Sequence, residues 1–367
     1  MSDRERILVT GFPGFRARFI VQEILRADER VEVVALVHPK AMAEAQRLAN
    51  AYGTDRFSLI EADPAAIDFG LSGSAYVDLA RSVGIVHHAF QVLELSEKPE
   101  VARRVNVAGT REIVEFGRAA TRLSRVVHYS SVFVSGNRSG VVREDELERG
   151  QGFRSSVEES LAVAEQMLRR ERNLPLTVVR TAQVVGDTKH GEAGRLDGPY
   201  PLLAFLASAP PGGALPLPPR SDATLHVVPV DYVAEAGVYL GRAKSALGRT
   251  VHLVDAEALS ARRFLELAAE RFGKRLESGF NAAAVTRAVV GNPGAALLAR
   301  RIRGVAELLT NTARYDDRSA VELLAPAGIV CPPISSYLPV LLSHVEARVA
   351  EKRLDDGRGE DDHDVPS

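Results

Sequence analysis

Short apolar runs rich in β-branched residues alternate with longer segments of helical periodicity through the first half of the chain. A repeated order of strand, helix and strand is typical of a parallel sheet covered by helices on both faces. Few polar residues interrupt the runs, as expected of strands that are buried on both sides. The sequence therefore predicts an α/β fold with a doubly wound parallel sheet. The runs lie at Ile7–Thr10, Val31–Val37, Phe57–Glu61, Ile85–His88, Arg125–Ser130 and Leu176–Arg180, with helical segments at Phe19–Arg26, Val105–Ala120 and Glu158–Arg172.

The composition of the chain predicts neither a nucleic-acid partner nor a transmembrane segment. The chain has 367 residues, with 46 Lys and Arg against 48 Asp and Glu, a formal net charge of -2. Because a basic excess is lacking, no nucleic-acid partner is expected. No apolar stretch is long enough for a transmembrane segment, and none is expected. The single Cys331 offers neither a disulfide nor a metal-ligand spacing, so we expect no metal and a cytoplasmic location.

The first predicted strand runs directly into a glycine-containing turn, Thr10–Ala17 (TGFPGFRA), and a helix follows. Gly11 permits a tight turn, and Gly14 lets the backbone approach a diphosphate. The helix N-terminus presents unpaired N–H groups to the phosphates, and Arg18 adds a positive charge. The turn thus predicts a Rossmann-type dinucleotide site, with a purely structural turn as the alternative. Its predicted cofactor-binding residues are Thr10, Gly11, Phe12, Pro13, Gly14, Phe15 and Arg18.

The second predicted strand ends without the acidic residue that would bind the hydroxyls of an adenosine ribose. The sequence there reads Ala35–Lys40 (ALVHPK). Lys40 and His38 would instead favour a 2′-phosphate. We therefore predict NAD(P)(H) as the cofactor, with a slight preference for NADP(H); a solvated Lys40 without a role is the alternative.

The pattern predicts several segments along the chain. Residues 1–186 form the NAD(P)-binding domain, and 226–255 return to it with a strand at 251–255. The proline-dense segment 187–225 is predicted as a lid or loop, with a passive linker as the alternative, because prolines cannot supply regular backbone hydrogen bonds. Residues 256–354 form a smaller, mainly helical C-terminal substrate domain, in which Ser260 caps a helix. The acidic tail, 355–367, is predicted to be disordered.

Further motifs follow the glycine turn in a fixed order. In that order the chain resembles the extended short-chain dehydrogenase/reductase family, and within it the branch of fatty acyl-CoA reductases and thioester-reductase domains. The resemblance implies that Asp63 lies against the adenine, that Ala89 and Phe90 line the cofactor, that Asn106 belongs to the same site, and that Ser131 hydrogen-bonds the substrate oxygen. The motifs are Asp63, Phe69–Ser72 (FGLS), His87–Phe90 (HHAF), Asn106–Thr110 (NVAGT), Ser130–Ser131 with Gly136, Arg180, Gly186, His226–Ala234 (HVVPVDYVA) and Cys331–Pro333 with Tyr337.

One motif of the family is missing. Its reactive pair is Tyr-x-x-x-Lys, but Val157 stands at the tyrosine position and Leu161 at the lysine position. Valine and leucine can neither donate a proton nor orient a ribose. General acid catalysis contributes about 10²- to 10⁴-fold, so its loss does not by itself abolish hydride transfer. We predict that Ser131 stabilises the developing alkoxide, with water or the substrate's own acidic group supplying the proton. The candidates for a replacement proton donor are His87, His88, Tyr129 and His190, with a packed or surface side chain without a catalytic role as the alternative for each.

The two aliphatic replacements, together with Phe90, Phe133 and the lid, predict an apolar chamber and hence a bulky hydrophobic substrate. We predict an NAD(P)H-dependent oxidoreductase that reduces a ketone, an aldehyde or an acyl thioester of specialised metabolism, with a carrier-bound substrate left open. The alternative is a cofactor-binding protein without redox turnover, acting as a sensor, partner or scaffold. A homodimer is also left open.

Overall fold

The computed structural model describes residues 4–95, 97–194, 198–208, 214–216, 223–277 and 311–361. They fall into two compact units. The first takes Met1–Val184, Val228–Ala256 and Ala313–Cys331, and the second takes Val185–Val227, Glu257–Thr312 and Pro332–Ser367. In the described part of the chain, no helix combines the length and the hydropathy that crossing a bilayer needs.

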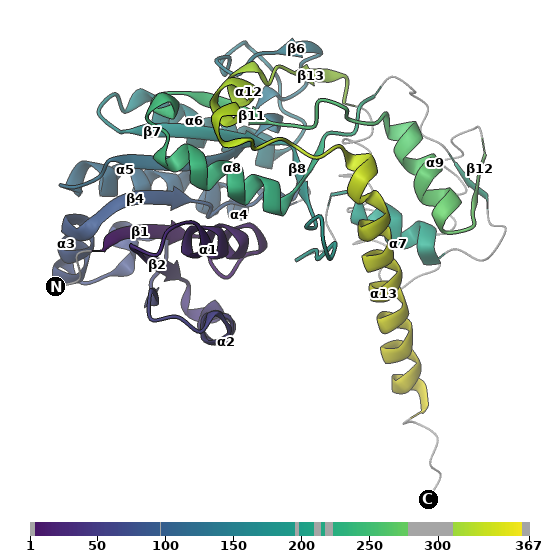
Figure 1. Cartoon of the computed structure of the whole chain (residues 1–367), viewed down its shortest axis with the longest axis horizontal. Coiled ribbons are helices and arrows are strands. Elements are labelled where there is room, and N and C mark those ends of the chain that lie inside the picture. Colours follow the sequence, from purple (N-terminus) through teal and green to yellow (C-terminus); the bar gives the residue numbers. More distant parts are fainter. Residues whose placement is uncertain are drawn as a thin grey trace, which may run out of the picture. The chain divides into compact units, whose positions relative to one another are not determined.

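A seven-stranded parallel sheet forms the centre of the first unit (Figure 1). The strand order is β11-β7-β5-β4-β1-β2-β3, and every neighbouring pair is parallel. The order reverses between β1 and β4, and ligands of such sheets bind at the carboxyl ends of the strands at this switch point. The predicted doubly wound sheet is confirmed. Its strands are β1 Glu5–Thr10, β2 Val31–Val37, β3 Phe57–Glu61, β4 Val83–His88, β5 Arg125–Ser131, β7 Leu176–Thr181 and β11 Thr250–Leu253.

Helices cover both faces of this sheet (Figure 1). One face carries α1 Phe15–Ala27 and α8 Val230–Arg242, and the other carries α3 Gly73–Ser82, α5 Gly109–Ala119 and α6 Ser156–Arg170. Because both faces are covered, β5 and β7 are buried along their whole lengths. The remaining short elements are α2 Met42–Tyr52, α4 Pro99–Ala102, a π-helical turn Arg103–Ala108, β8 Gln183–Val185 and β10 Val227–Pro229.

A late segment of the chain returns to the first unit. Strand β13 (Ala313–Tyr315) pairs in parallel with β6 (Gly140–Val142), and α12 (Arg318–Leu324) packs on β11. The predicted C-terminal domain of residues 256–354 is therefore wrong for Ala313–Cys331. Three-residue strands carry no periodicity that a sequence pattern can show, so tertiary pairing decides where this segment lies.

The Glu144 carboxylate fixes that returning segment. It is 5% exposed and accepts hydrogen bonds from three backbone N–H groups: His252 N at 2.9 Å, Ser319 N at 2.7 Å and Ala320 N at 3.2 Å. Burial raises the pKa of this carboxyl, while the three N–H groups oppose the rise. One buried side chain thus joins α12 to the edge strand β11.

The second unit contains α7 (Tyr200–Ser208), α9 (Ala261–Arg271) and the paired strands β9 (Ala214–Pro216) and β12 (Arg275–Glu277). The Ser260 side chain accepts a hydrogen bond from Arg263 N at 3.1 Å, so the predicted N-cap of α9 is confirmed. The prediction of an irregular lid over 187–225 is wrong at α7. Prolines at the start of a helix cost no hydrogen bond, because the first N–H groups have no partner within the helix.

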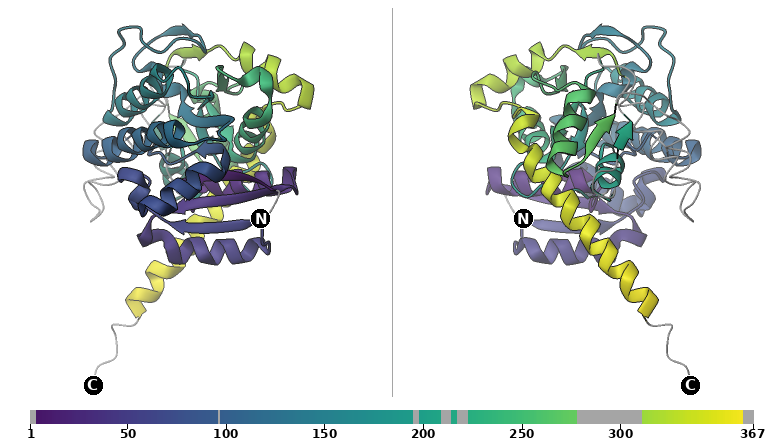
Figure 2. Two further views of the ribbon diagram at one scale, coloured as in Figure 1. Left: turned by 90° about the vertical axis from the view of Figure 1, so that its left-hand side faces the viewer. Right: turned by 90° about the vertical axis from the view of Figure 1, so that its right-hand side faces the viewer.

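Helix α13, Ile334–Asp361, is the long yellow helix of Figure 2. It enters the acidic segment that the sequence analysis predicted to be disordered, so that prediction is wrong for residues 355–361. A helix that has begun extends at little cost. Residues 362–367 lie outside the described residues.

Candidate cofactor and active site

The turn between β1 and α1 has no room for a side chain at its two glycines. Gly11 has a φ of +93°, and a Cβ there would lie 2.7 Å from the Ala89 carbonyl oxygen. A Cβ on Gly14 would lie 2.6 Å from the carbonyl oxygen of Gly11. Gly14 is the N-cap residue of α1 and supplies no side-chain acceptor to its first N–H groups. This exposed backbone at a helix N-terminus fits the diphosphate of a dinucleotide.

Thr10 fixes the turn from the inside. Its Oγ1 accepts a hydrogen bond from Phe90 N at 3.2 Å and lies 2.8 Å from His88 Nδ1, while His88 Nε2 lies 3.2 Å from Thr110 Oγ1. All three polar side chains are fully buried. Burial, followed by the nearby His128 and Arg16, holds the pKa of His88 well below its usual value. The Thr10 hydroxyl therefore supports the turn, and Ala89 and Phe90 form its wall.

The other predicted residues of the turn divide into two groups. Pro13, Phe15 and Arg18 are partly exposed, and the Arg18 guanidinium lies 5.7 Å from the centre of the Phe15 ring. Phe12 is 2% exposed, and its ring packs edge-on against Phe57 at 5.1 Å between centroids. The prediction of Phe12 as a cofactor contact is therefore wrong for its side chain, because the turn directs an apolar ring into the core.

The residues predicted for the adenosine half follow β2 and β3. His38 Nδ1 accepts a hydrogen bond from Lys40 N at 3.2 Å, and the Lys40 side chain is exposed. Asp63 Oδ1 accepts from Ala65 N at 3.0 Å, and Oδ2 pairs with the Arg104 guanidinium at 2.5 Å. Since β2 and β3 are neighbours, these groups follow adjacent carboxyl ends. Their roles toward a ribose phosphate and an adenine stay predictions.

The side-chain amide of Asn106 forms hydrogen bonds with other residues of the protein. It is fully buried; its Oδ1 accepts from Val92 N at 2.8 Å, and its Nδ2 donates to Val92 O at 3.0 Å and to Ser160 Oγ at 2.9 Å. The prediction of a direct cofactor contact is wrong, because these bonds occupy the amide. Asn106 instead fixes the segment that follows β4.

Ser131 is the last residue of β5. It is 3% exposed, and its Oγ accepts a hydrogen bond from Phe133 N at 3.2 Å. Because the hydroxyl accepts that bond, its own proton is left to donate to another acceptor. Ser131 thus places one O–H group at the carboxyl end of β5, and its hydrogen bond to a substrate oxygen stays a prediction.

A buried ion pair supports the neighbouring residue. Ser130 Oγ donates to Glu165 Oε2 at 2.9 Å, and Arg180 Nη2 lies 2.8 Å from Glu165 Oε1. Both partners of the pair are fully buried. Burial alone would raise the pKa of Glu165, but the charge and hydrogen bonds of Arg180 outweigh it and lower the pKa to about 2. This pair ties α6 to β7 behind the end of β5.

Val157 and Leu161 lie on the inner face of α6. They are 0% and 1% exposed and belong to an apolar cluster with Ala102, Val134, Leu147 and Ala162, against which Val92, Leu93 and Leu95 pack. The pair of positions that holds tyrosine and lysine in the family is therefore closed by packing. The prediction that these two side chains line an open apolar chamber is wrong, because small and branched neighbours fill the space around them.

His87 is not placed for proton transfer. It is 2% exposed, its Nδ1 lies 2.9 Å from the Tyr129 hydroxyl, and its ring closes on the backbone of Gly241 in α8. Burial, with a smaller contribution from Arg242, lowers its pKa to about 3. The proposed catalytic role of His87 is therefore wrong; this neutral imidazole packs between the sheet and α8.

Sequence reasoning missed Arg16. Its side chain is 8% exposed, and Nη2 donates to Gln91 Oε1 at 2.9 Å and to Ala89 O at 3.4 Å. The guanidinium lies 5.5 Å from the centre of the Tyr129 ring. The only signal in the sequence is a charged residue inside the glycine turn, between Phe15 and Ala17.

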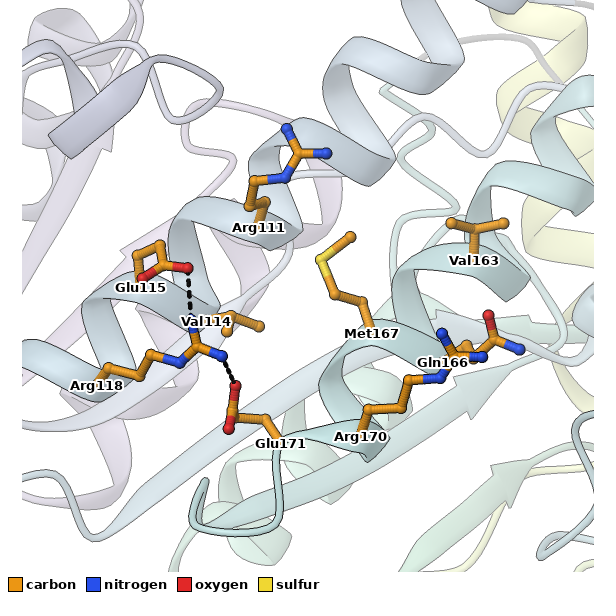
Figure 3. A pocket seen from close by; sticks show the side chains of 9 residues that line it. All are labelled: Arg111, Val114, Glu115, Arg118, Val163, Gln166, Met167, Arg170 and Glu171. Atoms are coloured by element: carbon orange, nitrogen blue, oxygen red, sulfur yellow. Dashed lines mark hydrogen bonds and ion pairs between the residues drawn. The ribbon is translucent and has the colours of Figure 1, made fainter.

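A groove between α5 and α6 is separate from these groups (Figure 3). Val114, Val163 and Met167 line it, and the Arg118 guanidinium bridges the carboxylates of Glu115 and Glu171. Its lining holds no histidine, serine or cysteine, and both of its carboxylates are paired with Arg118. Among the described residues, no cluster of His, Cys, Asp or Glu is arranged to hold a metal ion.

The sheet order, the glycine turn and the serine at the end of β5 define a dinucleotide-binding protein of the Rossmann type. The chain belongs to the NAD-binding family described as male sterility protein, whose sequence profile matches residues 9–237. The resemblance to the extended short-chain dehydrogenase/reductase branch is thereby confirmed. The predicted class of cofactor is confirmed as well, while the preference for NADP(H) stays a prediction.

Individual relatives extend the comparison. Fatty acyl-CoA reductase wat of Drosophila melanogaster is 22% identical over 271 residues, which cover 63% of this chain and 52% of the relative. The terminal R domain of the myxalamid PKS-NRPS pathway has a similar fold, with a TM-score of 0.77 and 23% identity over 94% of this chain and 91% of that domain. A thiolation-reductase di-domain of an archaeal non-ribosomal peptide synthetase has a TM-score of 0.71 and 17% sequence identity, over 94% of this chain and 76% of that chain. The chain spans 5%, 16% and 52% of the first three curated relatives.

Proposed function

We propose that the chain is an NAD(P)H-dependent reductase of a carbonyl group in a bulky hydrophobic substrate. The observation that carries this proposal is a shared sheet edge. The cradle, the turn at Gly11 and Gly14, follows the carboxyl end of β1, and the Ser131 hydroxyl lies at the carboxyl end of β5, with only β4 between the two strands. The relatives support the reaction class, since they include a fatty acyl-CoA reductase and a reductase di-domain.

The chain's own residues have limited but defined tasks in this reaction. The bound dinucleotide supplies the hydride. The glycine turn and the N-terminus of α1 hold its diphosphate. Ser131 donates its O–H to the carbonyl oxygen and keeps that bond as the oxygen gains negative charge. Val157 and Leu161 have no acidic proton, so water protonates an alkoxide. With a thioester, the oxyanion reforms the carbonyl and the C–S bond breaks, and the expelled thiolate takes its proton from water.

We propose an acyl thioester or an aldehyde as the substrate, with an activated ketone as the alternative. The fatty acyl-CoA reductase among the relatives supports a hydrophobic ligand. The thiolation domain joined to the reductase domain in the archaeal structure supports a carrier-bound acyl group. The cytoplasmic location, the homodimer and the choice of NADP(H) stay predictions.

The test measures loss of nicotinamide absorbance with NADPH and NADH over long-chain acyl thioesters, aldehydes and activated ketones. We expect turnover with at least one class, and a fall of about 10²- to 10³-fold in kcat for Ser131→Ala, because one oxyanion donor is lost. Ser124→Ala, just before the opposite end of β5, is the control; its Oγ donates to Gly84 O at 2.9 Å. An unchanged kcat in Ser131→Ala would show that Ser131 does not stabilise the carbonyl oxygen.

One observation favours the second candidate function, a cofactor-binding protein without turnover. Packing closes the positions of the usual proton donor at Val157 and Leu161. Such a protein would bind the dinucleotide and oxidise none of it with any member of the substrate panel. That result would replace the reductase proposal.

A further inference from the structure

Arg16 is a buried cation without an anionic partner among the described residues. Its Nε and Nη1 are shielded from solvent and donate no hydrogen bond. Only Nη2 has acceptors, and both are neutral: the Gln91 amide and the Ala89 carbonyl. The groups that act on it electrostatically include no carboxylate; burial lowers the pKa of Arg16 to about 10, and Tyr129 opposes the change. Arg16 therefore stays charged at neutral pH, and a buried charge without a counter-charge is costly.

The position of this charge ties it to the cradle. Arg16 is the second residue of α1, two residues after Gly14. The carbonyl that accepts from Arg16 Nη2 is that of Ala89, the same oxygen that leaves no room for a Cβ on Gly11. The guanidinium thus lies where the turn after β1 meets the end of β4, at the switch point of the sheet.

We propose that the diphosphate of the dinucleotide is the missing counter-charge of Arg16, so that this side chain is a cofactor-binding residue. The inference rests on the dinucleotide binding of the proposed function but not on turnover. A diphosphate brings two negative charges to the N-terminus of α1, where the helix dipole already favours them. A fixed positive charge in a site of low dielectric strengthens that attraction far more than a solvated one. Binding then removes the cost of leaving Arg16 uncompensated.

The experiment compares the affinities of purified variants for NADPH and NADP⁺, or for NADH and NAD⁺ if these bind more tightly, by calorimetry. Arg16→Gln keeps a polar side chain but removes the charge, and we expect it to weaken both redox forms equally, by about tenfold or more. Arg16→Lys keeps the charge and is expected to retain most of the affinity. Arg26→Leu, at the exposed end of the same helix, is the control. Thermal unfolding without cofactor should show Arg16→Gln to be at least as stable as the wild type.

Two results would overturn the inference. Equal affinity of Arg16→Gln and wild type would show that Arg16 only packs on Tyr129. A variant that weakens the reduced form but strengthens the oxidised form would show that the charge faces the nicotinamide ring instead. If Arg16→Gln does not fold, Arg16→Met, which removes the charge but keeps a long side chain, takes its place with the same expected loss. Wild-type binding without substrate turnover would end the reductase proposal and leave this inference standing.

Discussion

Gly11 carries two separate constraints, a left-handed backbone and contact with a neighbouring strand. Alanine there would strain φ, which is +93°, and would bring its Cβ to 2.7 Å from the Ala89 carbonyl oxygen. We expect Gly11→Ala to lower the free energy of unfolding by about 3 kcal/mol or more and to abolish dinucleotide binding. Urea denaturation and calorimetry measure the two effects.

Gly53→Ala is the matched control for this prediction. Gly53 also has a positive φ, +59°, but a Cβ there meets no atom within 4 Å. The control should therefore cost only about 1 kcal/mol and leave binding intact. Equal losses in both variants would show that backbone strain, rather than contact with Ala89, makes Gly11 necessary.

Residue by residue, the sequence predicts best where chemistry depends on the backbone. Gly11 and Gly14 form the turn that their spacing indicates, because no other residue fits there. His87, Asn106 and the Phe12 side chain were assigned to the site from motif position alone. A strand places successive side chains on opposite faces, and the motif does not state which face meets the cofactor. Arg16 was missed for a different reason: a charged residue is normally expected at the surface, and nothing in the sequence indicates that this one is buried.

At the scale of elements, α6 depends on the Glu165 carboxylate, which pairs with both Arg180 and Arg169. Glu165→Gln would leave the buried Arg180 guanidinium without its counter-charge, and we expect a loss of about 3–5 kcal/mol in the free energy of unfolding. Glu159→Gln on the same helix is exposed and should change stability little. If chemical denaturation gives the two variants the same midpoint, the pair does not hold α6 in place.

The returning segment Ala313–Cys331 depends on another carboxylate. Glu144→Gln replaces one of its two acceptor oxygens by an NH₂ group, which cannot accept from Ser319 N or from His252 N and Ala320 N. We expect a loss of about 1–3 kcal/mol, measured by urea denaturation. Glu148→Gln, with a side chain 65% exposed, is the control. An unchanged stability in Glu144→Gln would contradict the assignment of Glu144 as the anchor.

Strands were predicted well where burial leaves a mainly apolar run, as in β2, whose ends coincide with the predicted ones. The ends of β3, a partly exposed strand at the sheet edge, coincide as well. The segment with prolines and the acidic tail were predicted less well. Composition indicates which residues disfavour a helix, but α7 and α13 depend on packing and on where the helix begins.

The whole molecule should lose stability in mild acid. Burial first, with nearby arginines adding to it, lowers the pKa of His87 to about 3, of His128 to about 4 and of His252 to about 3, from a usual 6.5. Between these values and 6.5 the unfolded chain binds more protons than the folded one, so stability rises with pH. Below pH 6.5 each histidine should cost about 1.4 kcal/mol per pH unit.

Urea denaturation at pH 7.5 and pH 5.5 measures this slope. His88, whose pKa burial also lowers, adds to these three. We expect a drop of roughly 5–6 kcal/mol for the four histidines, smaller by about 1.4 kcal/mol in His87→Gln, which removes one of them. If His87→Gln shows the same drop as the wild type, His87 is protonated in the folded protein and the packing role assigned to it is wrong.

Hydride transfer from the bound cofactor to the substrate is tested most directly by isotope labelling. Cofactor deuterated at the reactive C4 position is mixed with the purified protein and the best acyl thioester or aldehyde, and the product is analysed by mass spectrometry. The account predicts one deuterium on the former carbonyl carbon for each cofactor oxidised, in a reaction that Gly11→Ala abolishes. Tight binding of the cofactor with no deuterium in any product would contradict it.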